Sequence, residues 1–306
     1  MQSIGKTCFT AMFALLATMS ATASAAAPSA KPLTTSDVLD NSQSSDWRTP
    51  NAVDLLILTL DDDDGARVVM ELAPAFAPQH ADNLRALARE HYFDGLAIMR
   101  VQENYVVQWG DPDGDKREVR TAKRTLPGEF FRSASGLNFS ALPDADVYAP
   151  EVGYVDGFPA ARDRQRGQAW LAHCYAALGV GRAMGADSGG GTELYVVIGH
   201  APRHLDRNIT LAGRVLQGME HLSALPRGTG TLGFYEKPEQ YVKIRSLRLA
   251  ADLPESERVA LQVLRTDTAT WKAYVETRRF RRDAWFIEPT GHADVCNVGV
   301  PVRAAP

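Results

Sequence analysis

The sequence predicts a mainly β protein, an all-β barrel or sandwich with a few helices. Short runs rich in Val, Ile, Leu and Tyr recur between residues 51 and 250, for example at 55–60, 67–72 and 241–250. Clusters of Gly, Pro, Asp and Asn separate these runs, as expected for turns between strands. Segments with helical spacing are few, and no internal repeat is evident, which together favour the β class.

The first two predicted strands form a hairpin. The run 55–60 (LLILTL) is apolar throughout and predicts a buried strand, and 67–72 (RVVMEL) predicts the returning strand. The turn between them, 61–65, begins with four consecutive aspartates. A calcium loop of the EF-hand type spaces its oxygen ligands along about 12 residues. We therefore interpret the aspartates as a solvated hairpin tip.

The clearest helix lies within 77–95. Pro78 suits the first helical turn. Apolar side chains then recur on one helical face, at Ala81, Leu84, Leu87 and Ala88. The helix is expected to end before Gly95, where a strand pattern follows.

The segment 98–115 (IMRVQENYVVQWGDPDGD) is predicted to be a strand with an unusual face. Side chains alternate along a strand, so Arg100, Val106 and Gln108, separated by even numbers, share one face if the strand runs on. That face carries a cation, an apolar group and an amide. Such a combination indicates either a structural ion pair or a binding surface.

The next stretch, 112–170, is irregular and rich in Gly, Pro, Asp and Arg. It is too long for one bare loop, so we predict an excursion with short strands. Regular patterns return downstream: an apolar segment at 168–181, a glycine-rich loop, strand and turn at 185–208, a strand and short helix at 209–225, and a strand at 241–250. The alternation of the last strand slips at Ser246, which indicates a bulge.

Composition argues against several classes of protein. Of the 306 residues, 45% are hydrophobic and 23% charged, as in an ordinary globular protein. The formal net charge of −4 gives no reason to expect nucleic acid as a partner.

The first 25 residues have the features of a secretory signal peptide. Lys6 precedes an apolar stretch, and Ala23 and Ala25 form an A-x-A pattern, so cleavage is predicted after Ala25. The alternative is an uncleaved anchor helix, for which the stretch is short. Cys8 leaves with the signal. We expect an exported protein in a bacterial periplasm, without a membrane span after cleavage, and a flexible lead-in over 26–50.

The predicted secondary structure changes from strands to helices at residue 251. Residues 251–306 predict a mostly helical extension with two helices, one opened by Pro254 and one capped by Thr266 or Asp267. Four arginines follow the second helix, at 278, 279, 281 and 282. Cations at a helix C-terminus are favoured by the macrodipole, so this cluster does not by itself indicate nucleic-acid binding.

Familiar hydrolase, nucleotide and metal patterns are missing from the sequence. DSGGGT at 187–192 lacks the Gly-Lys-Ser/Thr of a phosphate loop. His200 and His204 are four residues apart, but Pro202 between them argues against a metal-binding helix. His173 and Cys174 are adjacent and would point to opposite faces of a strand, which suits no base and nucleophile pair. We expect no metal and no cofactor.

Several segments, taken in order, resemble the cyclophilin peptidyl-prolyl isomerases. They are the hairpin with MELAP, the helix with NLRALA, YFDG, MRVQENYVVQWGDPDGD, GGGTELYVVIGH and HLDRNITLAGRVLQGME. The resemblance covers about residues 51–250. It implies a closed eight-stranded antiparallel barrel with capping helices, a groove on the outside of the barrel, and proline-containing polypeptides as clients.

By motif position, the resemblance also implies a set of site residues. Arg100 corresponds to the family's catalytic arginine, and Gln108 to the glutamine that holds a neighbouring carbonyl. The implied substrate-binding residues are Tyr105, Val106, Ala172, His173, Glu193, Tyr195 and Leu205. The chain departs from the family pattern at Met99, where a histidine is usual, and at Glu193, His204 and Ile209.

These residues suit the chemistry of X–Pro rotation. Amide resonance sets a barrier of roughly 18–20 kcal/mol, and the twisted transition state frees a lone pair on the proline nitrogen. A guanidinium that donates to this nitrogen only in the twisted form lowers the barrier. We expect an exported prolyl isomerase that assists the folding of exported proteins. The alternatives are a chaperone or scaffold that binds proline segments with weak catalysis, and a structural component of an envelope complex.

Two cysteines, Cys174 and Cys296, remain in the mature chain. An oxidising compartment favours a disulfide between them. Such a bridge would tie the extension back to the barrel. The alternative is two separate buried thiols, which are common for small apolar side chains.

Overall fold

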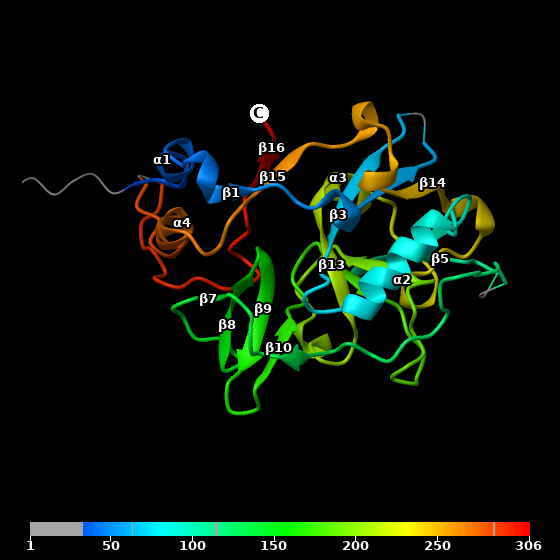
Figure 1. The fold of residues 1–306 in the computed structure, drawn as a ribbon, viewed down its shortest axis with the longest axis horizontal. Helices are drawn as coiled ribbons and strands as arrows, with labels where there is room; N and C mark the ends of the chain where they lie inside the picture. The colour runs from blue at the N-terminus through cyan, green and yellow to red at the C-terminus, as the bar shows by residue number, and fades with distance from the viewer. Residues whose placement is uncertain (1–32, 63, 114–115, 284) are drawn as a thin grey trace, which may run out of the picture. The chain divides into compact units, whose positions relative to one another are not determined.

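A computed structural model describes residues 33–62, 64–113, 116–283 and 285–306, and a closed β-barrel forms its largest part (Figure 1). Eight strands pair in the closed order β11-β12-β5-β4-β14-β2-β3-β13, and each named pairing is antiparallel. The barrel predicted from the family resemblance is therefore confirmed. The predicted signal peptide, 1–25, and the lead-in residues 26–32 lie outside the described residues.

The barrel strands fall at or near the segments that the sequence marks. Their bounds are Leu55–Leu60 (β2), Arg67–Leu72 (β3), Ala97–Val101 (β4), Val106–Gly110 (β5), Ala177–Val180 (β11), Leu194–Val197 (β12), Leu211–Gln217 (β13) and Val242–Leu249 (β14). The register of β14 against β2 shifts between Ile244 and Ser246, which confirms the bulge.

The barrel interior is filled by alternating side chains of these strands. Leu56, Leu58 and Val107 are almost wholly buried there, and Trp109 is the largest of the group. Helix α2 (Pro78–Arg89) packs Leu84 and Leu87 against the same cluster, as its predicted apolar face requires. A short helix, α3 (Met219–Ser223), follows β13 and adds Leu222.

The segment 98–115 is a hairpin rather than the single continuing strand that alternation suggests. Strands β4 and β5 pair with each other across a turn at residues 102–105, where Asn104 adopts a positive φ of 52°. The physical reason is that Asn tolerates the left-handed conformation that a tight reversal needs. The turn brings Arg100 and Gln108 opposite each other on neighbouring strands.

The irregular excursion forms a second sheet of short strands. Its five strands have the order β6-β10-β9-β8-β7. Their bounds are Arg132–Ser133 (β6), Phe139–Ala141 (β7), Glu151–Val155 (β8), Phe158–Asp163 (β9) and Gln168–Leu171 (β10). Phe158, Ala160 and Leu171 of this sheet share an apolar cluster with Tyr195 and Val197 from the outer face of the barrel.

The lead-in is more ordered than its composition predicts. Helix α1 (Thr35–Asp40) begins with a capping box between Thr34 and Asp37, and strand β1 (Trp47–Arg48) buries Trp47. The expectation of a flexible segment is therefore wrong for 33–50. Tertiary partners far along the chain, which composition does not show, hold this segment in place.

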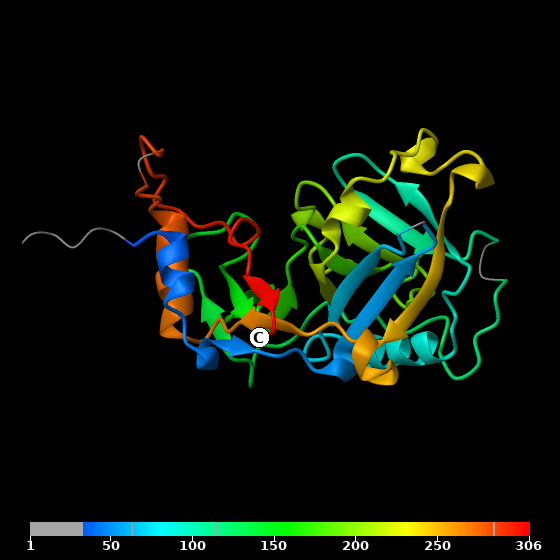
Figure 2. The same ribbon diagram turned by 90° about the horizontal axis from the view of Figure 1, so that it is seen from above.

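The expectation of a mostly helical extension is also wrong in its first half. The segment after Pro254 forms a single 3-10 turn and then strand β15 (Leu261–Leu264), which lies between β1 and β16 (Val302–Ala304) in a three-stranded sheet. The second predicted helix is present as α4 (Ala269–Arg279), capped by Thr268. Figures 1 and 2 both show α1 beside α4.

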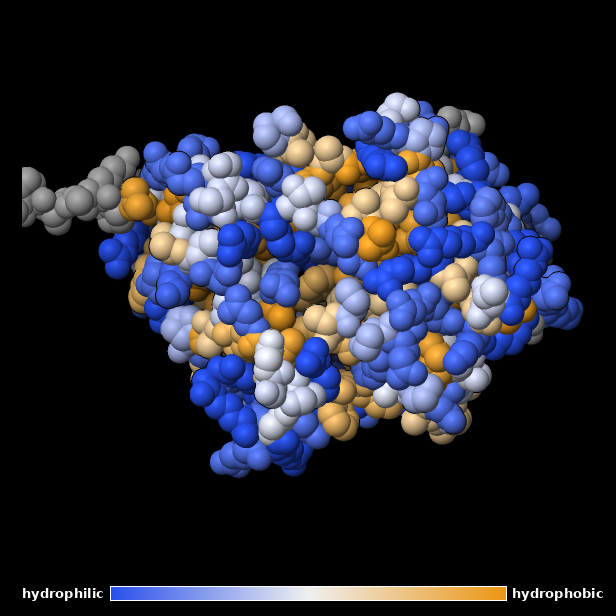
Figure 3. All heavy atoms as spheres, viewed as in Figure 1, coloured by the Kyte–Doolittle hydropathy of each residue, from blue (hydrophilic) through white to orange (hydrophobic). Residues whose placement is uncertain are grey.

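Polar side chains dominate the face seen in Figure 3, where apolar residues form small, separate patches. No helix within the described ranges is long and apolar enough to cross a membrane.

Candidate active site

A row of cross-strand neighbours on the outer face of the barrel forms the base of the site. Arg100 on β4 lies opposite Gln108 on β5, Gln108 opposite Tyr195 on β12, and Tyr195 opposite Gly179 on β11. Residues directly opposite one another in a sheet point to the same side. Three adjacent strands thus bring the side chains of Arg100, Gln108 and Tyr195 into one line, and β11 adds Gly179 at its end.

A bulge in β4 turns Arg100 outward. The register of β4 against β5 shifts between Ile98 and Arg100. Ile98 and Val101 both belong to the barrel core although they are separated by an odd number of residues. If β4 alternated regularly, with no bulge at Met99, Arg100 would lie on the same side as Ile98, in the core. Bulges commonly re-aim a side chain in this way next to active sites.

The row borders a pocket of about 140 Å³. Its lining is Arg100, Tyr105, Val106, Gln108, Gly181, Arg182, Tyr195, Leu205 and Ile209. Six of these nine are residues that the family resemblance implies. The pocket therefore combines an apolar wall with one amide and two guanidiniums, those of Arg100 and Arg182.

Neighbouring acceptors fix the Arg100 guanidinium. Nε donates to the Leu232 carbonyl at 2.7 Å, Nη1 to Gln108 Oε1 at 2.9 Å, and Nη2 to Gln102 Oε1. Its central carbon lies 5.6 Å from the centre of the Tyr105 ring and 5.5 Å from that of Phe234. Burial lowers the pKa of Arg100, an effect that Tyr105 partly opposes. Among these contacts one N–H on each terminal nitrogen is left to donate to a ligand.

Gln108 connects the guanidinium to a carboxylate. Its Oε1 accepts from Arg100, and its Nε2 donates to Glu193 Oε2 at 2.9 Å. Glu193 thus contacts the site through Gln108 and does not line the pocket. The amide is oriented from both ends, and its second N–H can donate to a bound carbonyl.

The apolar wall comes from three parts of the chain. Val106 and Tyr195 are 3% and 5% exposed, while Tyr105, Leu205 and Ile209 are half-buried. Leu205 ends a 3-10 helix, Arg203–Leu205. His204, in the middle of that helix, is exposed and is not part of the lining.

Ala172, His173 and Cys174 do not line the pocket. All three are buried, and they lie in the connection between β10 and β11. β11 pairs with β12, the strand that carries Tyr195. The residues that follow β11, Gly181 and Arg182, complete the lining of the pocket. The match to the family pattern places this side of the site several residues too early in the chain, because the segment adjoins the irregular excursion. The only sequence signal for Gly181 and Arg182 is their place directly after an apolar run.

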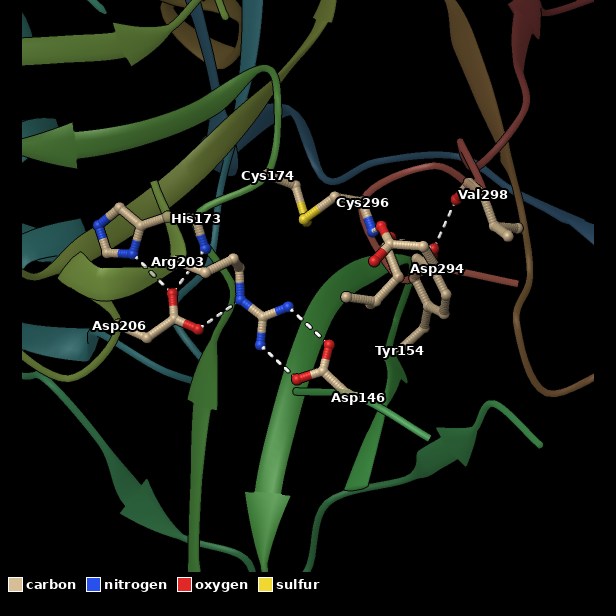
Figure 4. The surroundings of a disulfide bond; sticks show 10 residues. Asp146, Tyr154, His173, Cys174, Arg203, Asp206, Asp294, Cys296 and Val298 are labelled. Carbon is tan, nitrogen blue, oxygen red and sulfur yellow. Dashed lines mark hydrogen bonds and ion pairs between the residues drawn. A yellow bond between two sulfur atoms is a disulfide. The ribbon is translucent and has the colours of Figure 1, made fainter. Parts of the chain in front are cut away.

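Cys174 and Cys296 are joined. Their disulfide has an S–S distance of 2.04 Å and a Cα–Cα distance of 4.8 Å. Next to it, His173 lies within hydrogen-bonding distance of Asp206 and of the Tyr195 hydroxyl. Figure 4 shows His173 and Cys174 pointing to opposite sides of the backbone. Within the described ranges, no group of three His, Cys, Asp or Glu side chains is placed to hold a metal ion.

Comparisons with known proteins agree with this geometry. Residues 56–249 match the family model described as cyclophilin type peptidyl-prolyl cis-trans isomerase/CLD. A probable peptidyl-prolyl cis-trans isomerase of Brucella suis biovar 1 is 24% identical over 189 residues, covering 61% of this chain and 80% of the relative. The isomerase ppi1 of Schizosaccharomyces pombe is 39% identical over 51 residues, covering 17% of this chain and 33% of that protein.

Among solved structures, cyclophilin AquaCyp293 from Hirschia baltica superposes with a TM-score of 0.69 at 22% identity. The match covers 90% of this chain and 99% of that one, so the fold likeness extends beyond the barrel. A closed antiparallel barrel with an arginine and an amide beside an outer apolar pocket defines a class of proline-recognising proteins. The chain belongs to the cyclophilin-type peptidyl-prolyl cis-trans isomerases.

Proposed function

We propose that the pocket beside Arg100 binds the proline ring of a client polypeptide and that Arg100 and Gln108 catalyse rotation of the preceding amide bond. The observation that supports this most directly is the alignment of Arg100, Gln108 and Tyr195 along one row, next to an apolar pocket. A polar pair and a ring-sized apolar wall are the two parts that X–Pro rotation requires.

In this mechanism the side chains act through hydrogen bonds alone. The proline ring contacts Val106, Tyr195 and Leu205. The second N–H of Gln108 holds the carbonyl beside the imide. As the bond twists, the proline nitrogen becomes pyramidal and can accept a hydrogen bond, which a free N–H of Arg100 donates. Because this bond exists only in the twisted form, it stabilises the transition state more than the ground state.

The fixed geometry of Arg100 adds to this effect. Leu232, Gln102 and Gln108 already hold the guanidinium, so little reorganisation is needed when charge develops. Its half-buried position also strengthens the interaction by excluding water.

A protease-coupled assay on a short X–Pro peptide tests this proposal. Arg100→Ala is expected to lower kcat/KM by about 100-fold, as loss of a pre-organised donor does elsewhere. Arg245→Ala is the matched control, because Arg245 is a half-exposed arginine on β14 whose partners among the described residues are Asp61 and Asp62 in a turn, and it should retain full activity. Equal activity in wild type and Arg100→Ala would overturn the catalytic assignment. Retained peptide binding without activity in the wild type would instead favour a binding module.

The setting of this activity is also part of the proposal: an exported protein in a bacterial periplasm that assists the folding of other exported proteins. The signal pattern at 1–25 and the disulfide between Cys174 and Cys296 support it. Intact-mass analysis of protein recovered from periplasmic extract should give a mature chain beginning near Ala26. Recovery of the uncleaved chain from the cytoplasmic fraction would contradict export.

A further inference from the structure

The ring of Tyr195 extends beyond the pocket that it lines. Its cross-strand neighbour is Gly179, and a Cβ added at that glycine would lie 2.0 Å from Tyr195 Cζ. The ring therefore lies across the backbone of β11, and its hydroxyl reaches a buried position 3.1 Å from His173 Nε2. A buried hydroxyl without a hydrogen-bond partner costs free energy. His173 therefore helps to determine the position of the Tyr195 ring.

His173 is itself fixed. Its side chain is 1% exposed, and both its backbone N and its Nδ1 lie 2.9 Å from Asp206 Oδ1 (Figure 4). Burial alone would raise the pKa of Asp206, but the hydrogen bond from His173 and the charge of Arg203 hold that pKa below its ordinary value. An ionised carboxylate only accepts, so Nδ1 carries a proton. In the neutral imidazole Nε2 then accepts from the Tyr195 hydroxyl.

Behind Asp206 lie two more buried charges. Arg203 Nε donates to Asp206 Oδ2 at 2.6 Å, and Nη1 and Nη2 donate to Asp146 at 3.1 and 3.2 Å. The side chains of Arg203, Asp206 and Asp146 are 4%, 6% and 4% exposed. We call this chain of contacts, Asp146–Arg203–Asp206–His173, the His173 relay. Well-packed apolar side chains often stabilise a protein as much as buried charges do. A role in orienting His173 therefore explains the His173 relay better than a role in stability alone.

The disulfide anchors the other side of His173. Cys174, the next residue, is bonded to Cys296 in the C-terminal segment (Figure 4). The second sheet and α4 hold that segment in turn. The Tyr154 hydroxyl shares its one proton between the carbonyls of Val295 and Val298, at 2.7 and 2.5 Å, and Arg278 donates to that of Asn297 at 3.1 Å. The extension is thus connected to the pocket through two consecutive residues.

We propose that His173 is a positioning residue for the proline pocket: held by the relay on one side and by the Cys174–Cys296 disulfide on the other, it fixes the Tyr195 ring through the ring's hydroxyl. The C-terminal extension thereby controls the shape of the pocket. The inference rests on the proposed function of the pocket, and it adds a role for residues that do not touch the substrate.

The test is a double-mutant cycle on KM. Tyr195→Phe removes only the hydroxyl, and His173→Leu removes its partner together with the side-chain donor to Asp206, while Arg100 and Gln108 stay in place. Each is expected to raise KM about fivefold, the effect of losing one hydrogen bond, with kcat within about twofold. The double variant should be no worse than the poorer single variant, because both changes break the same contact. His173→Gln, which can still offer an acceptor, should recover part of the loss.

A matched control separates positioning from general loss of stability. Tyr274→Phe removes another buried hydroxyl, one that donates to the Gly299 carbonyl at 2.9 Å within the extension. It should lower the melting temperature about as much as Tyr195→Phe, yet leave KM unchanged. Additive effects in the cycle, or an equal rise of KM in Tyr274→Phe, would overturn the inference.

A second arm tests the disulfide. The double substitution Cys174→Ala with Cys296→Ala should raise KM at least about twofold, and should add nothing to the effect of Tyr195→Phe. An unchanged KM in this variant would overturn the part assigned to the extension. Direct titration of a proline-containing tetrapeptide accompanies each KM. If the wild type binds this peptide but does not isomerise it, the proposed catalysis fails, while the cycle on the dissociation constant still decides the role of His173.

Discussion

At the scale of single residues, Arg100 depends on geometry as much as on charge. Three acceptors are arranged to match its planar guanidinium. The bulge at Met99 points the guanidinium toward the pocket. A lysine ammonium is a point charge on a flexible stem. The site should therefore distinguish strongly between two cations of equal charge.

We predict that Arg100→Lys keeps less than about one tenth of the wild-type kcat/KM, because the ammonium cannot hold all three acceptors and still donate to the imide nitrogen. The dissociation constant for a proline peptide should change by less than about threefold. Stopped-flow isomerisation and calorimetry measure the two quantities. Recovery of most of the activity by lysine would show that charge alone suffices.

A second residue-scale prediction concerns stability in acid. The Glu90 carboxylate accepts hydrogen bonds from the backbone N–H of Arg120, Thr121 and Ala122, and from the Thr121 hydroxyl. Burial alone would raise the pKa of Glu90, but these bonds lower it from 4.5 to about 2. A lowered folded-state pKa adds stability above the unfolded value, and that stability is lost as the pH falls from about 4.5 toward 2.

The free energy of unfolding of the wild type should therefore fall more steeply between pH 4.5 and 2 than that of Glu90→Gln, which carries no titrating group there. Urea denaturation at several pH values measures this difference. Glu118→Gln is the control, since Glu118 is exposed and its removal should leave the pH dependence as in the wild type. Parallel curves for wild type and Glu90→Gln would refute the role of this carboxylate.

At the scale of elements, the sequence predicts well those strands and helices that have a local pattern. It does not predict those that depend on pairing with distant segments. β2, β3 and α2 carry their own signals in apolar runs and spacing, and all were predicted near their observed bounds. The local pattern around β15 predicts a helix, because the strand character of this segment comes from lying between β1 and β16, which are distant in the sequence. The order of 33–50 has the same origin.

The site follows the same rule. Arg100, Gln108 and Tyr195 lie in segments with recognisable motifs. Gly181 and Arg182 lie close to the irregular excursion, where the sequence does not align clearly with the family pattern. The pairing of β11 with β12 shows that they belong to the site. The burial of His173 could not be predicted either, since its partners Asp206 and Tyr195 come from other parts of the chain.

The disulfide gives an element-scale prediction. It closes a loop with a sequence separation of 122 residues, for which the chain-entropy model gives about 5 kcal/mol of stabilisation. Replacing both cysteines by alanine should lower the free energy of unfolding by several kcal/mol, since strain and structure in the unfolded chain reduce the ideal value. Thermal denaturation without reductant measures the change. A melting temperature equal to that of the wild type would show that packing alone holds the C-terminal segment.

At the scale of the whole molecule, the extension covers part of the barrel wall. Leu55, Ile57 and Val69 share a buried cluster with Ala250 and Leu261, against which Val302 packs. The barrel therefore has an apolar outer face that the extension shields from water. Removing the extension would expose this face as well as Cys174.

A chain ending at Ala250 should accordingly bind a hydrophobic dye and aggregate more readily than the intact protein, because a contiguous apolar patch becomes exposed. Fluorescence titration and light scattering at equal concentrations measure both effects. A stable, monomeric fragment with wild-type dye binding would show that the barrel wall needs no cover.

The small sheet β1-β15-β16 joins both ends of the described chain, and this has a consequence for the order of assembly. The barrel strands all lie between Leu55 and Leu249, so the barrel can close before the last residues take part. β1 is made early but acquires its neighbour only when residues 261–264 follow, and the sheet is complete only when β16 arrives. A nascent chain would thus hold a closed barrel with a loose end. Cys296 and β16 both follow the last barrel strand, so under the proposed role of His173 the pocket reaches its final form only after the barrel has closed and the disulfide has formed.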